Sequence, residues 1–251
     1  MFRNQRRQLI LDLIRENGSC KVQTLSQTFN VTEPTVRQDL NALENEGLIV
    51  RQHGGAYIKE KSTQNVSLVL PPRGHDEEKD RIGAKAATFV QNSDNIILDS
   101  GSTVTAMVKY INQQNLTIIT NAINIAIELS DNPQNNIILI GGELKLPTLS
   151  LTGATGISML EPIHASKLFL ATGAFDVKTG LTYPSFSDLE LKRAMIEKSS
   201  EVFLLADSSK LGKTLFASLG KVQIHHIITD SGISQEQANL IKANDIDLII
   251  V

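Results

Sequence analysis

Apolar residues recur every three or four positions through the first 45 residues, which predicts three amphipathic helices. Their apolar faces are formed by Leu9, Ile10, Leu13 and Ile14, by Val22, Leu25 and Phe29, and by Val36, Leu40 and Leu43. Thr32 can cap the third helix, and Pro34 falls in its first turn, where a missing amide proton costs little. Two apolar segments, 48–51 and 56–58, then flank a turn and predict a β-hairpin. Residues 1–60 are therefore expected to form a winged helix-turn-helix domain.

The pattern changes after residues 61–76, which lack periodicity, contain Pro71-Pro72 and predict a linker. Beyond a helical stretch at 78–90, short apolar runs alternate with amphipathic stretches. The runs, expected to be strands, are 96–98, 116–119, 137–140, 168–170, 202–205, 227–228 and 248–251. The stretches expected to be helices are 103–111, 122–129, 188–199 and 235–243. This alternation predicts an α/β domain over residues 77–251, with a mainly parallel sheet covered by helices on both faces.

Composition narrows the classes of function. The net charge of −3 gives no overall basic signature, so a case for DNA binding depends on motif and placement. Aromatic residues make up 4% and Trp is absent, which argues against base-stacking platforms for RNA or single strands. Cys20 is the only cysteine, so no intrachain disulfide, structural zinc site or other cofactor is expected. No apolar run is long enough to span a membrane and the first ten residues are too polar for a signal peptide, so we expect a cytoplasmic location.

The third helix has a polar outer face suited to the DNA major groove. Arg37 can donate two hydrogen bonds to guanine and Gln38 can pair with adenine, contacts worth about 1–3 kcal/mol of discrimination each. The expected DNA-binding residues are Thr32, Glu33, Thr35, Arg37, Gln38 and Asn41 on the helix, and Arg51 and His53 on the hairpin. The N-terminal Arg3, Arg6 and Arg7 are candidates for phosphate contacts. A winged unit can also act as a protein-docking domain, and that alternative stays open.

Small polar residues follow four of the predicted strands. Residues 99–103 (DSGST) open a helix, where backbone amides and hydroxyls can bind an anion, although Ser and Thr also occur there as ordinary caps. Thr120-Asn121, Gly141-Gly142 and residues 207–210 (DSSK) follow other strands. In a parallel sheet such loops meet at one edge. Together with the charge of Lys210, they predict a site for a small phosphorylated, hydroxyl-rich ligand.

The N-terminal motif RRQLILDLI…LSQTFNVTEPTVRQDLNALENEGLIVRQHGGA resembles the DeoR family of bacterial transcriptional regulators. The resemblance covers essentially the full length, because ILDSGST, IITNAINIA, ILIGGEL, LFLATGAFD…GLT and LLADSSKLG also match the family. The family usually has two adjacent arginines where this chain has Arg37-Gln38, and often Glu where it has Asp188. The resemblance implies a C-terminal domain similar in fold to ribose-5-phosphate isomerase, with phosphate held by the DSGST loop and Lys210. The effector-binding residues expected are Asp99, Ser100, Gly101, Ser102, Thr103, Asn121, Gly142, Gly173, Asp176, Asp188 and Lys210.

The expected function is that of a sequence-specific regulator, a repressor of a carbohydrate-utilisation operon. It would bind a double-stranded DNA operator as a homodimer or homotetramer and respond to a phosphorylated sugar or sugar acid. The alternative is an isomerase-like enzyme with an appended DNA-binding domain. No catalytic residue is expected, because Thr172 stands where such isomerases have the first of two aspartates and no Lys-Gly-Gly stretch follows. A purely structural or docking module is the third possibility, and it predicts no effect of sugar phosphates on stability.

Overall fold

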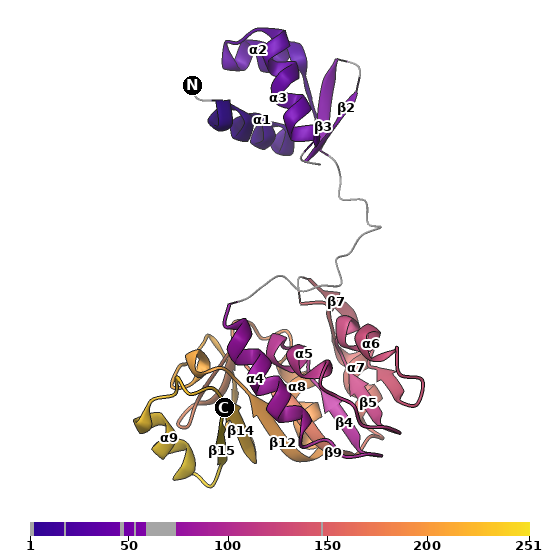
Figure 1. Cartoon of the computed structure of the whole chain (residues 1–251), viewed down its shortest axis with the longest axis vertical. Coiled ribbons are helices and arrows are strands. Elements are labelled where there is room, and N and C mark those ends of the chain that lie inside the picture. The colour runs from indigo at the N-terminus through magenta and orange to yellow at the C-terminus, as the bar shows by residue number, and fades with distance from the viewer. Residues whose placement is uncertain (1–2, 18, 46–47, 53, 59–73, 147) are drawn as a thin grey trace. The chain divides into compact units, whose positions relative to one another are not determined.

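The computed structural model describes residues 3–17, 19–45, 48–52, 54–58, 74–146 and 148–251 (Figure 1). The chain divides into two compact units, Met1–Ser67 and Leu68–Val251. Residues 61–73 of the predicted linker lie outside the described residues. Asp76, placed at the end of that linker, is the first residue of a helix.

The N-terminal unit contains the three predicted helices and the predicted hairpin. Its elements are α1 (Arg3–Asn17), β1 (Ser19–Lys21), α2 (Val22–Phe29), α3 (Glu33–Asn45), β2 (Ile49–Gln52) and β3 (Gly55–Ile58). The short strand β1, which was not predicted, pairs with β3, so the sheet order is β1-β3-β2. Leu9 was expected on the buried face of α1 but is 42% exposed, and Leu11 is buried instead.

Two adjacent glycines shape the hairpin. Gly54 has φ of 86°, a conformation that side chains with a Cβ rarely adopt. A Cβ on Gly55 would lie 2.5 Å from the carbonyl oxygen of Cys20 on β1. The Gly-Gly pair therefore makes the turn and lets β3 approach β1.

The C-terminal unit alternates strands and helices along most of its length. Its first half contains α4 (Asp76–Ala87), β4 (Asn95–Leu98), α5 (Ser102–Val108), β5 (Thr117–Thr120), α6 (Ile123–Leu129), β6 (Asn136–Leu139), β7 (Glu143–Lys145), β8 (Ser150–Thr152) and α7 (Ala154–Leu160). Its second half contains β9 (Ala165–Ala171), β10 (Ala174–Asp176), β11 (Gly180–Tyr183), α8 (Leu189–Glu197), β12 (Ser199–Leu205), the 3-10 turn η1 (Ser208–Lys210), β13 (Ala217–Gly220), β14 (His226–Thr229), α9 (Gln235–Lys242) and β15 (Asp247–Ile250).

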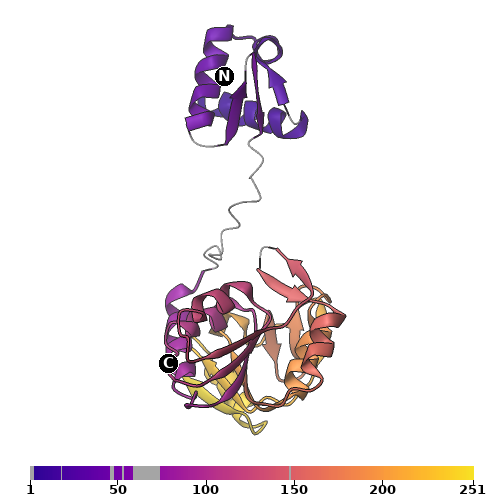
Figure 2. The same ribbon diagram turned by 90° about the vertical axis from the view of Figure 1, so that its right-hand side faces the viewer.

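A seven-stranded parallel sheet forms the centre of this unit, in the order β15-β14-β12-β9-β4-β5-β6. These are the seven strands that the apolar runs predict, so the parallel α/β prediction is confirmed. Residues on β4 alternate between two cores: Ile96 and Leu98 pack with α4, α5 and α6, whereas Ile97 packs with α7 and α8. The helices consequently cover both faces of the sheet (Figure 2).

The pattern did not predict the antiparallel additions. Strands β10, β11 and β13 form a small sheet, and β7 pairs with β8 as a hairpin. All four residues of β11 are buried, so the strand lacks the alternation that marks a half-exposed strand. Strand β7 has three residues, too few for a periodic signal. Lys145 of β7 and Tyr183 of β11 lie near the carboxyl ends of the parallel strands, whereas Phe175 of β10 and Gly180 of β11 lie near the amino ends of β14 and β15.

Candidate functional site

The outer face of α3 is polar and exposed, as the helical spacing predicts. Val36, Leu40 and Leu43 are buried in the core of the unit. Of the expected DNA-binding residues on this helix, Thr35 is half-buried and the exposed ones are Thr32, Glu33, Arg37, Gln38 and Asn41. The helix can therefore present these side chains to a groove.

Two contacts order this face. Arg37 Nη2 lies 3.1 Å from Glu33 Oε2, and each side chain is about half exposed. The Thr32 and Thr35 hydroxyls are 2.9 Å apart. Exposed pairs of this kind are weak, so Arg37 can leave Glu33 for a base at little cost.

Arg51 connects the β2–β3 hairpin to helix α3. Its guanidinium donates to Asn41 Oδ1, and its backbone amide donates to Glu44 Oε1 at 3.0 Å. Its Nε atom is buried and makes no hydrogen bond to the described residues. Arg51 therefore braces β2 against α3. His53, the other hairpin residue expected to contact DNA, lies outside the described residues.

Asp39 on α3 is fully buried and holds α1 against α3. Its carboxylate accepts from Arg6 Nε at 2.6 Å and from Arg7 Nε at 3.3 Å. Each of these two arginines therefore uses its Nε atom inside the unit, and the phosphate-contact prediction for them stays a prediction. The sequence did carry a signal, since Asp39 falls on the apolar stripe between Val36 and Leu40.

A cavity of about 250 Å³ lies in the C-terminal unit where β4, β9 and β12 end. Seven of the expected effector-binding residues line it: Ser100, Gly101, Ser102, Thr103, Gly173, Asp188 and Lys210. Sequence reasoning missed three further lysines on its wall, Lys79, Lys145 and Lys192. The loops at the carboxyl edge of the sheet thus meet, as expected for a parallel sheet.

The DSGST loop offers hydrogen-bond donors to this cavity. Within the described residues, the hydroxyls of Ser100 and Ser102 and the ammonium of Lys210 make no hydrogen bond or ion pair. Gly101 brings the loop close to β9, because a Cβ there would lie 2.0 Å from the Ala171 Cβ. The loop can therefore surround a small anion opposite Lys210.

The other lysines differ in how far they are neutralised. Lys145 Nζ lies 2.5 Å from Asp188 Oδ2 and 2.8 Å from Ser187 Oγ, which ties the β7–β8 hairpin to the start of α8. Lys79 is 5% exposed and donates to the Gly74 carbonyl, with Asp76 Oδ1 at 3.8 Å. Lys210 thus has no carboxylate within ion-pair distance among the described residues, and Lys79 has only the exposed Asp76 at 3.8 Å, so these two are the cations best placed to attract an anion.

A buried ion pair lies behind the cavity. Lys192 donates to Asp99 Oδ2, which also accepts from the Ala171 amide at 3.0 Å. The Lys192 ammonium lies 5.0 Å from the centre of the Tyr183 ring. Burial, reinforced by the negative charge of Asp99, raises the pKa of Tyr183 well above its usual value, so its hydroxyl stays protonated and donates to the Ala171 carbonyl at 3.1 Å.

The turn that carries Lys210 is held by two aspartates. Asp207 Oδ1 accepts from the Ser209 amide at 3.2 Å. Asp230 accepts from the Ser208 amide at 2.6 Å, from the Ser208 hydroxyl at 2.9 Å and from the Gly232 amide at 2.8 Å. Burial opposes ionisation of Asp230, but these hydrogen bonds outweigh it and lower its pKa.

Four expected effector-binding residues do not line this cavity: Asp99, which belongs to the ion pair behind it, and Asn121, Gly142 and Asp176. Asn121 is buried and donates to the Leu151 carbonyl at 3.0 Å. Gly142 has φ of 147° and packs so closely that a Cβ would lie 2.1 Å from the Thr152 carbonyl oxygen. Asp176 accepts from the amides of Lys178 and Thr179 in its own turn. Asn121, Gly142 and Asp176 each shape a local connection in the structure.

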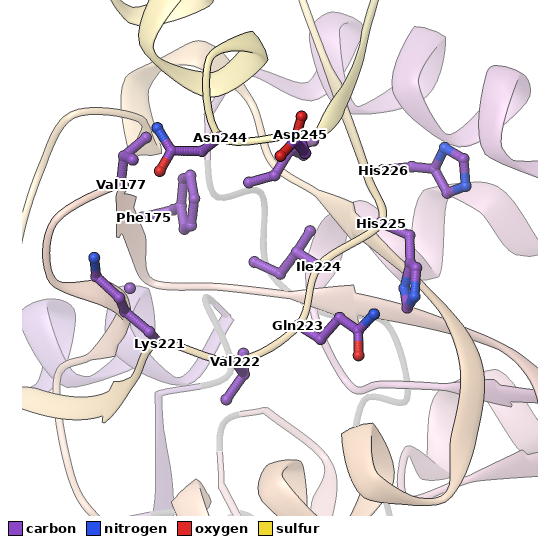
Figure 3. Close-up of a pocket in the computed structure, with 12 residues that line it drawn as sticks. Phe175, Val177, Lys221, Val222, Gln223, Ile224, His225, His226, Asn244 and Asp245 are labelled. Carbon is purple, nitrogen blue, oxygen red and sulfur yellow. The ribbon is translucent and has the colours of Figure 1, made fainter.

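A larger cavity, about 510 Å³, lies at the amino ends of β14 and β15, the opposite edge of the sheet (Figure 3). Phe175 and Ile224 point into it, and its polar rim includes Lys221. The histidines beside it are already engaged: His225 Nδ1 accepts from the Val202 amide, and the His226 ring bridges Glu201 and Asp247. The unengaged donors Ser100, Ser102 and Lys210 meet at the smaller cavity, which seven of the expected effector-binding residues line.

The smaller cavity gathers cationic and hydroxyl side chains. Its carboxylates, Asp188 and Asp207, are engaged with Lys145 and Ser209, which leaves neither as a free base. Among the described residues there is also no cluster of three His, Cys, Asp or Glu side chains that could hold a metal ion. No described helix is long and apolar enough to cross a membrane.

A winged helix-turn-helix unit and an α/β unit with such a cavity define a DNA-binding regulator that senses a small molecule. Residues 6–62 match the DeoR-like helix-turn-helix domain, and residues 74–231 match the DeoR C-terminal sensor domain. The chain belongs to the DeoR family of transcriptional regulators. We call its C-terminal unit the sensor domain below.

Relatives with similar full-length sequences are transcriptional regulators and not enzymes. The chain is 32% identical to the transcriptional repressor GlcR of Bacillus subtilis, over all of this chain and 97% of that one. It is 34% identical to the uncharacterised regulator YulB of the same organism, over 98% and 96% of the chains. It is 30% identical to the glycerol-3-phosphate regulon repressor of Escherichia coli, over 92% of each.

Solved structures give more distant matches. Ribose 5-phosphate isomerase A from Neisseria gonorrhoeae matches 54% of this chain and 53% of its own, with 15% identity and a TM-score of 0.40. The sorbitol operon regulator SorC from Klebsiella pneumoniae matches 81% and 89%, with 11% identity and a TM-score of 0.39.

Proposed function

We propose that this regulator is a repressor of carbohydrate-utilisation genes whose operator affinity is set by a phosphorylated sugar or sugar acid. The observation that carries this proposal is the convergence of Lys79, Lys210 and the residue 100–103 loop on one cavity. Lys210 without an ion-pair partner among the described residues, Lys79 with only the exposed Asp76 at 3.8 Å, and unengaged hydroxyls together favour a phosphate group. The cavity volume of about 250 Å³ leaves room for a small polyhydroxylated moiety beside it.

In this proposal the roles are divided among the cavity residues. Lys210, Ser100, Gly101, Ser102 and Thr103 hold the phosphate. Gly173 and Asp188 lie toward the sugar. The Asp188 carboxylate accepts a hydrogen bond from a sugar hydroxyl while it also contacts Lys145. Asp99 acts from behind the wall by holding Lys192 in place.

At the other end, α3 enters the major groove and its exposed residues contact bases. Glu33, Arg37, Gln38 and Asn41 are the proposed base-contacting residues, while Thr32 and Thr35 contact phosphates or thymine methyl groups. Arg51 holds Asn41 in position. A helix-turn-helix protein commonly binds repeated half-sites, so we further propose that the chain acts as a homodimer or homotetramer.

A thermal-shift screen tests the effector assignment. A ligand that binds only the folded chain adds about 2.7 kcal/mol of stability at a hundredfold excess over its Kd. We expect stabilisation by one or more sugar phosphates and none by the matching unphosphorylated sugars. Lys210→Ala should abolish that stabilisation, whereas Lys221→Ala, at the larger cavity, should leave it intact. Equal stabilisation of wild type and Lys210→Ala would refute the phosphate assignment.

A further inference from the structure

Lys79 joins the cavity to the first described residue of the sensor domain. Its side chain is 5% exposed and lines the cavity together with Ser100–Thr103 and Lys210. The same ammonium donates to the carbonyl of Gly74, where the described part of this domain begins. One charged group therefore contacts both the proposed anion site and the point at which the chain arrives from the DNA-binding unit.

The backbone at this point has an unusual conformation that Lys79 supports. Gly74 has φ of 75° and His75 has φ of 55°, so two consecutive residues are left-handed. Non-glycine residues rarely adopt this conformation, and the His75 side chain makes no cap hydrogen bond to α4. Lys79 binds both residues, since its amide donates to the His75 carbonyl at 3.0 Å and its ammonium to the Gly74 carbonyl.

Helix α4 cannot easily move away from the cavity. A Cβ on Gly83 would lie 2.7 Å from the backbone of Ala106 and Met107, so α4 packs directly on α5. Helix α5 begins at Ser102 within the DSGST loop. The backbone of Lys79 is thus held at a fixed place relative to the DSGST loop. The parts that can still change conformation are the Lys79 side chain and residues 74–76.

We propose that Lys79 couples occupancy of the cavity to the conformation of residues 74–76, an inference that rests on the proposed phosphate site. A phosphate dianion competes for the ammonium with the neutral Gly74 carbonyl and with the exposed Asp76 carboxylate, whose Oδ1 lies 3.8 Å away. Hydrogen bonds between charged groups are the stronger ones, and the Asp76 contact is longer than a hydrogen bond. When the ammonium turns to the phosphate, the left-handed turn loses a donor and relaxes. By linkage, any arrangement of residues 74–76 imposed by DNA binding changes the affinity for the anion.

Hydrogen exchange measured on the full chain separates the two parts of this proposal. The probes are inorganic phosphate and glycerol 3-phosphate, each compared with chloride at matched ionic strength. Peptides covering 100–108 report anion binding, and peptides covering 74–80 report the turn. We expect the anions to slow exchange in the first segment and to accelerate it in the second by about tenfold, the effect of one lost hydrogen bond.

Lys79→Met keeps the length of the side chain and removes its charge. It should weaken binding of glycerol 3-phosphate by roughly 10- to 100-fold, the range for a hydrogen bond to a charged group. Exchange at 74–80 should be fast without any anion and should no longer respond. Lys79→Arg, which keeps the charge, should retain both responses, and Lys85→Met, on the same helix, should behave as wild type.

The outcomes distinguish the coupling from the anion site. Protection at 100–108 without a change at 74–80 would overturn the coupling and leave the proposed function standing. A lack of protection at 100–108 with both probes would overturn the phosphate site and the coupling with it. If Lys79→Met does not fold, a Lys79→Arg variant that binds the anion but leaves 74–80 unchanged also overturns the coupling.

Discussion

Replacing Asp99 by asparagine removes one charge from the buried ion pair behind the cavity. The Asp99 side chain has no exposed surface and the Lys192 side chain is 9% exposed. Asp99 Oδ1 makes no hydrogen bond to the described residues, so the carboxylate depends on Lys192 and on the Ala171 amide. With asparagine at this position, the Lys192 ammonium would retain a neutral amide oxygen and the face of Tyr183, but no buried counter-charge.

The structure sets the expected magnitude. Removing one partner of a buried pair costs about 3–5 kcal/mol, because the other charge stays buried without compensation. In a domain the length of the sensor domain, 1 kcal/mol changes Tm by about 2–4 °C, so Asp99→Asn should lower Tm by roughly 6–20 °C. Lys192→Met should cost a similar amount. The double variant leaves no buried charge, so its loss should be smaller than the sum by at least about 2 kcal/mol.

Calorimetry of the full chain measures these changes, with the sensor-domain transition identified by its response to sugar phosphates. Asp188→Asn serves as the matched control. Its partner Lys145 and Asp188 itself are 30% and 24% exposed, so this change should cost no more than about 1 kcal/mol. Additive losses in the double variant, or equal losses for Asp99→Asn and Asp188→Asn, would refute the argument that burial makes the Asp99 pair strong.

Three further predictions concern the two ends of the molecule. Arg37→Ala should weaken operator binding and reduce the preference for one base by about 1–3 kcal/mol, while stabilisation by sugar phosphate persists. An unchanged operator affinity in a gel-shift titration would disprove the placement of α3 in the groove. Asp39→Asn should lower the free energy of unfolding of the N-terminal unit by about 3 kcal/mol in denaturant titrations, because Arg6 then lacks its carboxylate partner. A decrease below about 1 kcal/mol would contradict this prediction. Asp230 has a folded-state pKa below the usual 3.8, so its stabilisation is present above that pH and disappears as pH falls through the folded value. Asp230→Asn should therefore narrow the difference in stability between pH 7 and strong acid, and an unchanged pH profile would exclude this role.

The periodic parts of the fold were predictable from the sequence. All seven strands of the parallel sheet coincide with apolar runs. The inner strands are buried on both faces, and the edge strands β6 and β15 are apolar although only half-buried at their centres. The loops that follow them then meet by topology, which is why Ser100 and Lys210 could be placed at one site. Strand β11 and the β7–β8 hairpin were missed because they are short or lack alternation. Asp176 was expected among the effector-binding residues by resemblance alone, and in the structure its carboxylate accepts from two amides of its own turn.

The missed charged residues share one pattern. Asp39, Lys79 and Lys192 each lie on the apolar stripe of an amphipathic helix, and all three are buried. A charge on such a stripe indicates a buried partner, which is local for Lys79 and distant in sequence for Asp39 and Lys192. The sequence cannot name that partner, because Arg6 lies 33 positions from Asp39 and Lys192 lies 93 positions from Asp99. Long-range pairs of this kind depend on packing that local patterns do not encode.

Operator affinity measured with and without a stabilising sugar phosphate tests the central claim most directly. The operator would be selected from random duplex DNA by the full chain, and binding followed by fluorescence anisotropy at fixed salt. Coupling between two sites is typically worth 5- to 150-fold, so the sugar phosphate should change wild-type operator affinity by about that factor. Lys210→Ala should bind the operator with wild-type affinity and show no change. The account would be contradicted if no stabilising sugar phosphate changed the operator affinity of the wild type. It would also be contradicted if the operator affinity of Lys210→Ala changed by the same factor as that of the wild type.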